Sequence, residues 1–143
     1  MLENANQISD ISFAPYVQGE NEEYMSDLQL AHFRQILLKW RQALQQDISD
    51  TVGHLQQEPM NHADPLDRAT QQEEMTLELR TRDRESKLIR KIDQTLERIR
   101  EDDYGYCDTC GIEIGVRRLE ARPTANLCVD CKSIAEIKER VQR

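Results

Sequence analysis

The sequence has few aromatic side chains and no long apolar run. Of its 143 residues, 5% are aromatic and 32% are charged, a balance that favours long solvated helices burying one face over a large compact core. No apolar run is long enough to cross a bilayer, and the first residues, MLENANQISD, lack a basic segment followed by an apolar core. We therefore expect a cytoplasmic protein without membrane association, whose thiols stay reduced.

An excess of positive charge is also missing. The net charge is -8, and between residues 102 and 143 seven Lys or Arg residues stand against eight Asp or Glu residues. Such a chain repels the phosphate backbone, so we expect a protein partner and no direct binding to DNA. The sparse cations Arg117, Arg118, Arg122 and Lys132 suit a small anion better than a duplex. A nucleic-acid-binding zinc ribbon, the competing interpretation, predicts salt-sensitive binding to bare DNA.

The four cysteines follow the spacing of a zinc site. Cys107 and Cys110 form one C-x2-C pair, and Cys128 and Cys131 form a second pair after seventeen intervening residues. Two residues between thiols allow one turn to present both sulfurs to one metal, and four thiolates complete a tetrahedron with no position left for a substrate. The spacing therefore predicts one structural Zn²⁺. An added role of the thiols in sensing oxidants stays open.

Two details around the cysteines support this prediction. Gly111 follows the first pair directly and can adopt the positive φ that such a turn often requires. The second pair leads into a helical pattern over residues 132–141, whose first N–H groups would stabilise the thiolates of Cys128 and Cys131.

Two long helices precede the cysteines. Ser26 and Gln29 form a capping box that begins the first helix, and proline at position 59 ends it after Glu58. Asp64 caps the second helix, Pro65 fits its first position, and the pattern continues to about residue 101. Apolar side chains recur at coiled-coil spacing in both helices: Phe33, Leu37, Trp40, Leu44, Ile48 and Leu55, then Met75, Leu79, Ile89, Ile92, Leu96 and Ile99.

A short connection forces the two helices to run antiparallel. We predict an all-α protein with an N-terminal arm over residues 1–25 that packs on the globular module, a coiled coil over residues 26–101 with its tip at residues 59–69, and a four-cysteine zinc finger with a C-terminal helix over residues 102–143. Folding the chain about residues 61–62 pairs Leu44 with Leu79 and Ile48 with Met75. Residues 80–87 then lack apolar side chains and either pack their arginine stems under Trp40 or form a solvated stretch.

The tip carries two carboxylates whose role the pattern leaves open. Asp64 and Asp67 have a purely structural explanation as the cap and first-turn charge of a helix. At the tip of a long coiled coil, the same carboxylates could also reach a metal or a basic group inside a partner's cavity. The three histidines lack further ligands that would complete a metal site.

Three motifs resemble the DksA/TraR zinc-finger family of bacterial transcription regulators. They are DPLDRA (residues 64–69), LELRTRDRESKLIRKI (residues 77–92) and YGYCDTCGIEIGVRRLEARPTANLCVDCK (residues 104–132). Together the likeness covers about residues 20–141. Because all four cysteines are present, the chain looks like the zinc-containing branch of the family.

The resemblance implies a monomeric, non-enzymatic regulator that enters the secondary channel of bacterial RNA polymerase and destabilises open promoter complexes. It implies cooperation with guanosine tetraphosphate (ppGpp), repression of ribosomal RNA promoters and activation of some amino-acid biosynthesis promoters. The residues that match family positions are Asp64, Asp67 and Ala69 at the tip, Lys91, Arg122 and Lys132 around ppGpp, and Arg84 and Leu88 as nearby contacts. A Gre-type transcript-cleavage factor, which also carries acids at the tip of a coiled coil, is the alternative.

Overall fold

The computed structural model describes residues 14–57 and 64–142, and within these residues it contains four helices and no strand. Helix α1 spans Asp27–Gln57, α2 Pro65–Arg100, α3 Val116–Ala121 and α4 Val129–Val141. The predicted all-α fold is confirmed. The described residues form two compact units, residues 39–57 with 64–91 and residues 14–38 with 92–142. No described helix is long and apolar enough to cross a membrane.

The ends of the two long helices follow their capping residues. At the start of α1, the Gln29 N–H donates to Ser26 Oγ at 3.4 Å, and Gln29 Oε1 accepts from the Met25 N–H at 2.8 Å. At the start of α2, Asp64 Oδ1 accepts from the Leu66 N–H at 2.9 Å. These contacts satisfy N–H groups that have no partner inside the helix. Both predicted helix starts are therefore confirmed.

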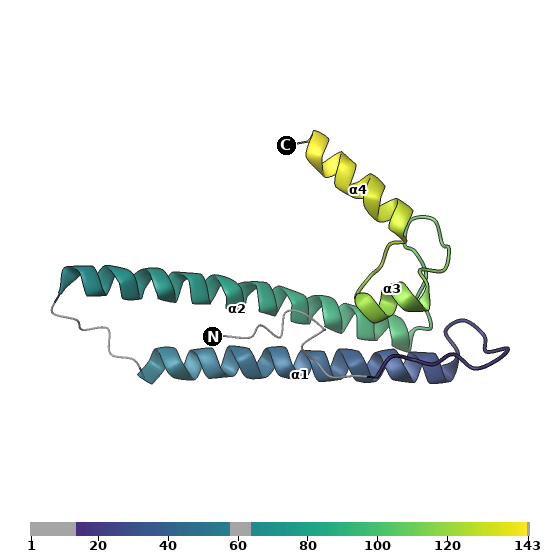
Figure 1. The fold of residues 1–143 in the computed structure, drawn as a ribbon, viewed down its shortest axis with the longest axis horizontal. Helices are drawn as coiled ribbons and strands as arrows, with labels where there is room; N and C mark the ends of the chain where they lie inside the picture. The colour runs from purple at the N-terminus through teal and green to yellow at the C-terminus, as the bar shows by residue number, and fades with distance from the viewer. Residues whose placement is uncertain (1–13, 58–63, 143) are drawn as a thin grey trace. The chain divides into compact units, whose positions relative to one another are not determined.

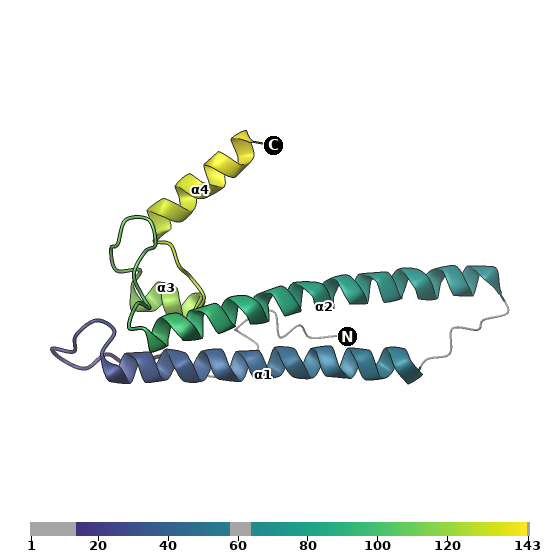
Figure 2. The ribbon, with the colours of Figure 1, turned by 180° about the vertical axis from the view of Figure 1, so that it is seen from behind.

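In the first unit, the second half of α1 pairs antiparallel with the first part of α2, as Figures 1 and 2 show from opposite sides. Trp40 and Leu44 supply buried apolar side chains from α1. Thr51, which interrupts the apolar pattern, is also buried, and its hydroxyl donates to Asp47 O at 3.0 Å. The facing positions of α2 are polar, because Arg82 and Glu85 are buried there.

The register of the two helices differs from the predicted one. Asp47 acts electrostatically on Glu85, whereas pairing Ile48 with Met75 would place Asp47 beside residue 76. Leu79, the predicted partner of Leu44, is 49% exposed. The predicted register is therefore wrong, because polar side chains occupy the buried positions of α2 where the prediction assumed apolar ones. The alternative of a solvated stretch over residues 80–87 is wrong for Arg82 and Glu85.

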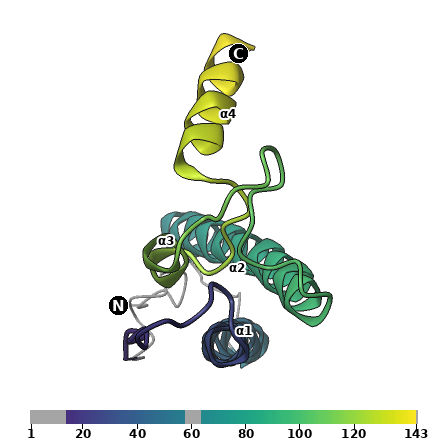
Figure 3. The same cartoon turned by 90° about the vertical axis from the view of Figure 1, so that its right-hand side faces the viewer.

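In the second unit, the first turns of α1 and the last turns of α2 form a small core with the segment that follows them. Figure 3, an end view, shows α4 extending away from the loops that connect it to the rest of this unit. The core side chains are buried, with Phe33 and Tyr104 in ring contact at 5.7 Å between centroids: Phe33, Ile36, Leu37, Ile92, Ile99, Tyr104, Ile114 and Leu119. No residue of α4 is buried, so the cysteine-bearing loops hold α4 in place.

Candidate zinc centre and partner-binding residues

The first cysteine pair lies on a tight turn after α2. Helix α2 is followed by a left-handed residue, Asp102, with φ of 58°, and the Asp103 N–H donates to Arg98 O at 2.9 Å. Gly111 has φ of 77°, as predicted, and its N–H donates to Cys107 O at 2.9 Å. The turn closes with the Cys107 N–H donating to Ile112 O at 2.9 Å. Glycine at position 111 therefore allows the turn that brings Cys110 back towards Cys107.

The second cysteine pair begins helix α4. Cys128 is the N-cap of α4, and its sulfur accepts the Cys131 N–H at 3.4 Å. The N–H groups of a helix start stabilise negative charge on such a sulfur. The predicted contact between this helix start and a cysteine sulfur is confirmed for Cys128, whereas for Cys131 it stays a prediction. The helix begins at Val129, three residues earlier than expected.

Contacts between the two pairs hold them face to face. The Asp108 N–H donates to Asn126 O at 2.9 Å, and Asn126 Nδ2 donates to Asp108 Oδ2 at 3.1 Å. The buried Tyr104 adds a third contact, because its hydroxyl donates to Pro123 O at 2.7 Å. Each of these bonds joins the segment before or within the first pair to the segment before the second pair.

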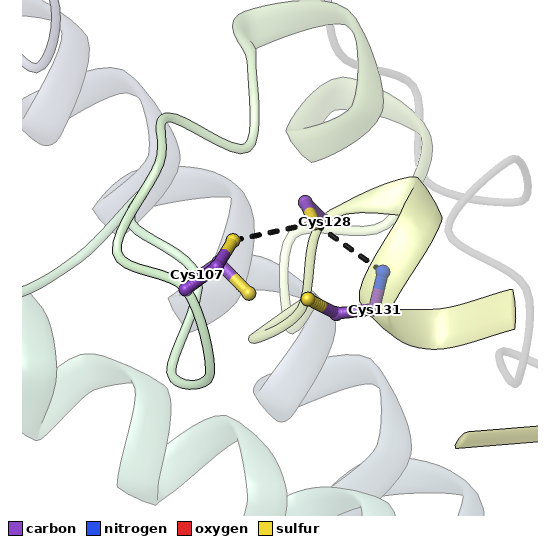
Figure 4. Close-up of side chains that lie close together, drawn as sticks. Cys107, Cys128 and Cys131 are labelled. Carbon is purple, nitrogen blue, oxygen red and sulfur yellow. Dashed lines mark hydrogen bonds between the residues drawn. The ribbon is translucent and has the colours of Figure 1, made fainter. Parts of the chain in front are cut away.

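The four sulfurs converge on one point. All four Sγ atoms lie within 4.8 Å of one another, and those of Cys110 and Cys128 are 3.7 Å apart; Figure 4 shows Cys107, Cys128 and Cys131 facing one another. Ligands of a tetrahedral zinc with Zn–S bonds of about 2.3 Å are separated by about 3.8 Å. The cysteines therefore fit the predicted Zn²⁺ ion.

The electrostatics of the thiols also favour a cation. Hydrogen bonding to the backbone N–H of Cys110 lowers the pKa of Cys107 to about 6. Hydrogen bonding to Cys128, and then to Cys110, raises the pKa of Cys131 to about 12. Thiols packed this closely do not all ionise unless a positive charge neutralises them. Four thiolates supply the soft ligand set that Zn²⁺ prefers, and no fifth group is needed.

The predicted tip residues lie at the start of α2. Asp64, Asp67 and Ala69 are exposed on the first turns, as far as the described residues show, whereas residues 59–63 of the predicted tip lie outside them. One oxygen of Asp64 is used as the helix cap. The structural interpretation of Asp64 is thus correct, and its exposure leaves the second oxygen available for a partner.

The remaining predicted residues belong to both units. In the first unit, Arg84 and Lys91 are exposed, Leu88 is half-buried, and Arg84 Nη2 donates to Thr81 Oγ1 at 3.4 Å. In the second unit, Arg122 is exposed as the C-cap of α3, and Lys132 is half-buried in the first turn of α4. Because Lys91 belongs to a different unit from Arg122 and Lys132, their grouping stays a prediction.

The sequence predicts that the N-terminal arm packs on the globular module, but its local patterns do not identify the side chains that hold residues 14–26 in the second unit. Glu120 Oε1 accepts the Tyr16 N–H at 2.8 Å and lies 2.8 Å from His32 Nε2. The Tyr24 hydroxyl donates to Gly105 O at 2.6 Å and accepts the Gly115 N–H at 2.9 Å. These partners are 81 to 104 residues apart in sequence, beyond the reach of a local pattern. Residues 1–13 of the predicted arm lie outside the described residues.

Two long helices followed by a four-cysteine zinc finger define a small helical zinc-binding protein, and comparison with known proteins identifies its family. Residues 29–99 match the family described as DnaK suppressor protein DksA, N-terminal domain, and residues 102–136 match the prokaryotic dksA/traR C4-type zinc finger. The chain belongs to the DksA family. Members of this family are regulators of transcription and not enzymes, which is also the class of this chain.

Individual relatives support the same assignment. The chain is 58% identical over 126 residues to the RNA polymerase-binding transcription factor DksA of Escherichia coli (strain K12), covering 88% of this chain and 83% of the relative. The chain is also 57% identical to the RNA polymerase-binding transcription factor DksA of Haemophilus influenzae, with a match that covers 88% of this chain and 87% of that relative. Among solved structures, transcription factor DksA2 from Pseudomonas aeruginosa matches with a TM-score of 0.73 and 43% identity, covering 82% of this chain and 90% of that chain.

Proposed function

We propose that this protein is a cytoplasmic, monomeric transcription regulator that binds bacterial RNA polymerase directly. The tip of its coiled coil enters the secondary channel and destabilises open promoter complexes, without contact to DNA. Ribosomal RNA promoters are repressed and some amino-acid biosynthesis promoters are activated, in cooperation with ppGpp. The observation that carries the proposal is the pair of exposed carboxylates, Asp64 and Asp67, at the helix start of a chain whose relatives are named RNA polymerase-binding factors.

The charge of the chain supports a polymerase contact over a DNA contact. With a net charge of -8, the protein is repelled by the phosphate backbone and is steered towards cationic protein surfaces. Exposed carboxylates on the first turn of α2 reach such a surface ahead of the rest of that helix. Ala69, on the same turns, leaves room for a close approach to the polymerase.

The role of ppGpp rests on three cations. Lys91, Arg122 and Lys132 carry the charge that a polyphosphate requires, and the planar guanidinium of Arg122 can bind phosphate in a bidentate manner. Arg84 and Leu88 contact the polymerase or the nucleotide beside them. Within this proposal, zinc holds the segments that bear Arg122 and Lys132 in place and supplies no chemistry.

The direct test is in-vitro transcription from a ribosomal RNA promoter, with and without ppGpp. We expect inhibition by the protein alone and stronger inhibition when ppGpp is added. A result without inhibition in either condition contradicts the proposal. A gel-shift with the promoter fragment alone should show no complex, because the net charge of -8 opposes binding to the phosphate backbone.

The substitution Lys91→Ala tests separately whether the protein cooperates with ppGpp through Lys91. Removing this ammonium group should lower the additional inhibition caused by ppGpp and leave basal inhibition largely intact. Transcription assays across a ppGpp titration measure the effect. Equal ppGpp stimulation in variant and parent would exclude Lys91 from the binding site.

The tip carboxylates also support a second function, in which a Gre-type factor stimulates RNA cleavage in backtracked polymerase. Asp64 and Asp67 would then position Mg²⁺ for hydrolysis. A stalled, backtracked complex distinguishes the two functions. Rapid RNA shortening that depends on both aspartates would establish cleavage, whereas we expect none.

A further inference from the structure

A fully buried carboxylate lies in the middle of the coiled coil. Glu85 is 0% exposed and Arg82 is 7% exposed, and Arg82 Nη1 lies 3.1 Å from Glu85 Oε2. Both side chains come from α2 and occupy positions where a coiled coil normally buries apolar groups. Charges in such a place are stabilised only by one another and by partners on the facing helix.

Asp47 supplies the third charge, from α1. Burial raises the pKa of Glu85, the charge of Arg82 opposes this rise, and the nearby carboxylate of Asp47 adds to it. Each residue also has at least one buried atom without a hydrogen-bond partner: Asp47 Oδ2, Arg82 Nε and both carboxylate oxygens of Glu85, of which Oε2 makes only the ion pair with Arg82. The three side chains thus form one buried charge cluster that joins the two helices and contains one cation for two carboxylates.

The charge cluster can form in the observed register of α1 against α2 but not in the registers that are shifted by seven residues. A slip of one heptad moves Trp40 or His54 into the position of Asp47 on α1, and neither offers a carboxylate. The same slip moves Asp47 to the level of Glu78 in one direction or of Ile92 in the other. Beside Glu78, the carboxylate of Asp47 would face a like charge and lie away from Arg82. Beside Ile92, it would face an apolar side chain and lack a charged partner, which is unfavourable for a buried carboxylate.

The apolar side chains of this unit specify the register poorly. On the described part of α2 between residues 64 and 91, the buried side chains are the polar Arg82 and Glu85, and Met75 and Ile89 are only half-buried. Buried polar groups in other coiled coils fix register at a cost in stability. The buried charges are therefore the strongest register signal in this stretch.

We propose that Asp47, Arg82 and Glu85 are positioning residues that fix the register of the coiled coil and so determine how far Asp64 and Asp67 project beyond the end of α1. In Figure 1, the first turns of α2 extend past the last turn of α1. A slip of one heptad changes this projection by roughly 10 Å. The consequence for transcription rests on the proposed function of the tip, whereas the register itself does not.

The register is measured by the distance between spin labels on the two helices. Because the native cysteines hold zinc, the labels are attached to keto-bearing amino acids introduced at the exposed positions Gln45 and Arg80. For the zinc-loaded parent, we expect one narrow distance distribution by electron–electron double resonance. For the variant Asp47→Leu, Arg82→Leu and Glu85→Leu combined, we expect retained helicity, an unchanged or higher thermal midpoint, and a broader distribution with additional distances.

Controls separate the buried cluster from charge removal in general. Asp83 and Lys87 form an exposed pair on α2, 3.0 Å apart, with side chains 62% and 66% exposed. The combined variant Asp83→Leu and Lys87→Leu should keep the parent's distance distribution. A single parent-like distance in the triple-leucine variant contradicts the proposal, and so does loss of its helicity, because apolar replacement must leave the coiled coil intact.

Exchanging the charges between the two helices provides a second, independent test of the charge cluster. Arg82→Glu leaves three carboxylates in the cluster, so its thermal midpoint should fall and its distances should broaden. Adding Asp47→Arg restores one cation for two carboxylates and should return both properties towards the parent. If the double variant is no better than Arg82→Glu alone, the side chains are not coupled and the proposal is wrong.

Transcription assays then connect the register to the tip. If the triple-leucine variant shows additional distances and also loses promoter inhibition, the register positions the tip as proposed. If the distances change and inhibition does not, the positioning role for the tip is wrong and the register role stands. If the parent itself shows no inhibition, the proposed function fails, and the distance measurements still decide the register.

Discussion

Replacing Tyr24 with phenylalanine should destabilise the second unit, because one hydroxyl connects two turns of the zinc-finger segment. The Tyr24 hydroxyl donates to Gly105 O at 2.6 Å and accepts from the Gly115 N–H at 2.9 Å. Burial raises the pKa of Tyr24 above its usual value, so the hydroxyl keeps the proton that it donates. Phenylalanine retains the ring, which contacts Tyr106 edge-on at 5.6 Å between centroids.

The expected loss follows from the two bonds. Gly105 O keeps a partner after the substitution, because the Ile114 N–H also donates to it at 2.9 Å. The Gly115 N–H loses the partner that the hydroxyl supplied, and an unpaired backbone group costs about 1–3 kcal/mol. Tyr24 is half-buried, so water replaces part of the bond, and we expect a total loss of about 1–2 kcal/mol in the free energy of unfolding.

Urea denaturation of the zinc-loaded protein, followed by circular dichroism, measures this loss. Ser133→Ala is a suitable control, since Ser133 is an exposed residue of α4 whose hydroxyl donates to Val129 O within the same helix; its effect should stay within about 0.5 kcal/mol. A change of that small size for Tyr24→Phe would refute the reasoning that the hydroxyl supports the turns.

Two further predictions concern charge and metal. Hydrogen bonds from Tyr16, then Ser26 and the Gly19 N–H, lower the pKa of Glu22 to about 2, so its stabilising effect is present above the usual carboxyl pKa and is lost as the pH falls. The stability difference between the parent and Glu22→Gln should therefore shrink as the pH falls from about 4.5 to about 2, and a constant difference contradicts this. Removing zinc with a chelator should unfold the cysteine-bearing segment, since structural zinc contributes about 10–16 kcal/mol to small domains. Circular dichroism should show the loss of α3 and α4, whereas the fluorescence of Trp40, in the first unit, should change little; an unchanged spectrum means that the cysteines hold no structural metal.

Local signals account for the parts of the fold that the sequence predicts well. Asp64 and Ser26 cap their helices through neighbours two or three residues away, and proline at position 59 excludes a continuous helix. The cysteine spacing and Gly111 similarly specify the zinc turn through nearby atoms. For these features, the chemistry that fixes the structure lies within one turn of chain.

Features that depend on distant partners were not predictable. Helix α3 has only six residues, and its buried Leu119 is held by the second unit's core rather than by a helical pattern of its own. The predicted register of the two helices was wrong because it was based only on the spacing of apolar residues. The buried positions of α2 in the first unit are instead occupied by Arg82 and Glu85. Tyr24 and Glu120 were missed because their partners lie more than 80 residues away.

The most direct test of the proposed function compares Asp67→Asn with the parent in two assays. Asparagine keeps the size of the side chain and removes only its charge, and Asp67 is an exposed residue of the first turn of α2. We expect unchanged affinity for RNA polymerase, measured by competition binding, and loss of most of the inhibition at a ribosomal RNA promoter. If affinity and inhibition fall together, the Asp67 carboxylate contributes only to binding RNA polymerase. If the variant keeps its inhibition, the proposed role of the tip in destabilising promoter complexes is wrong.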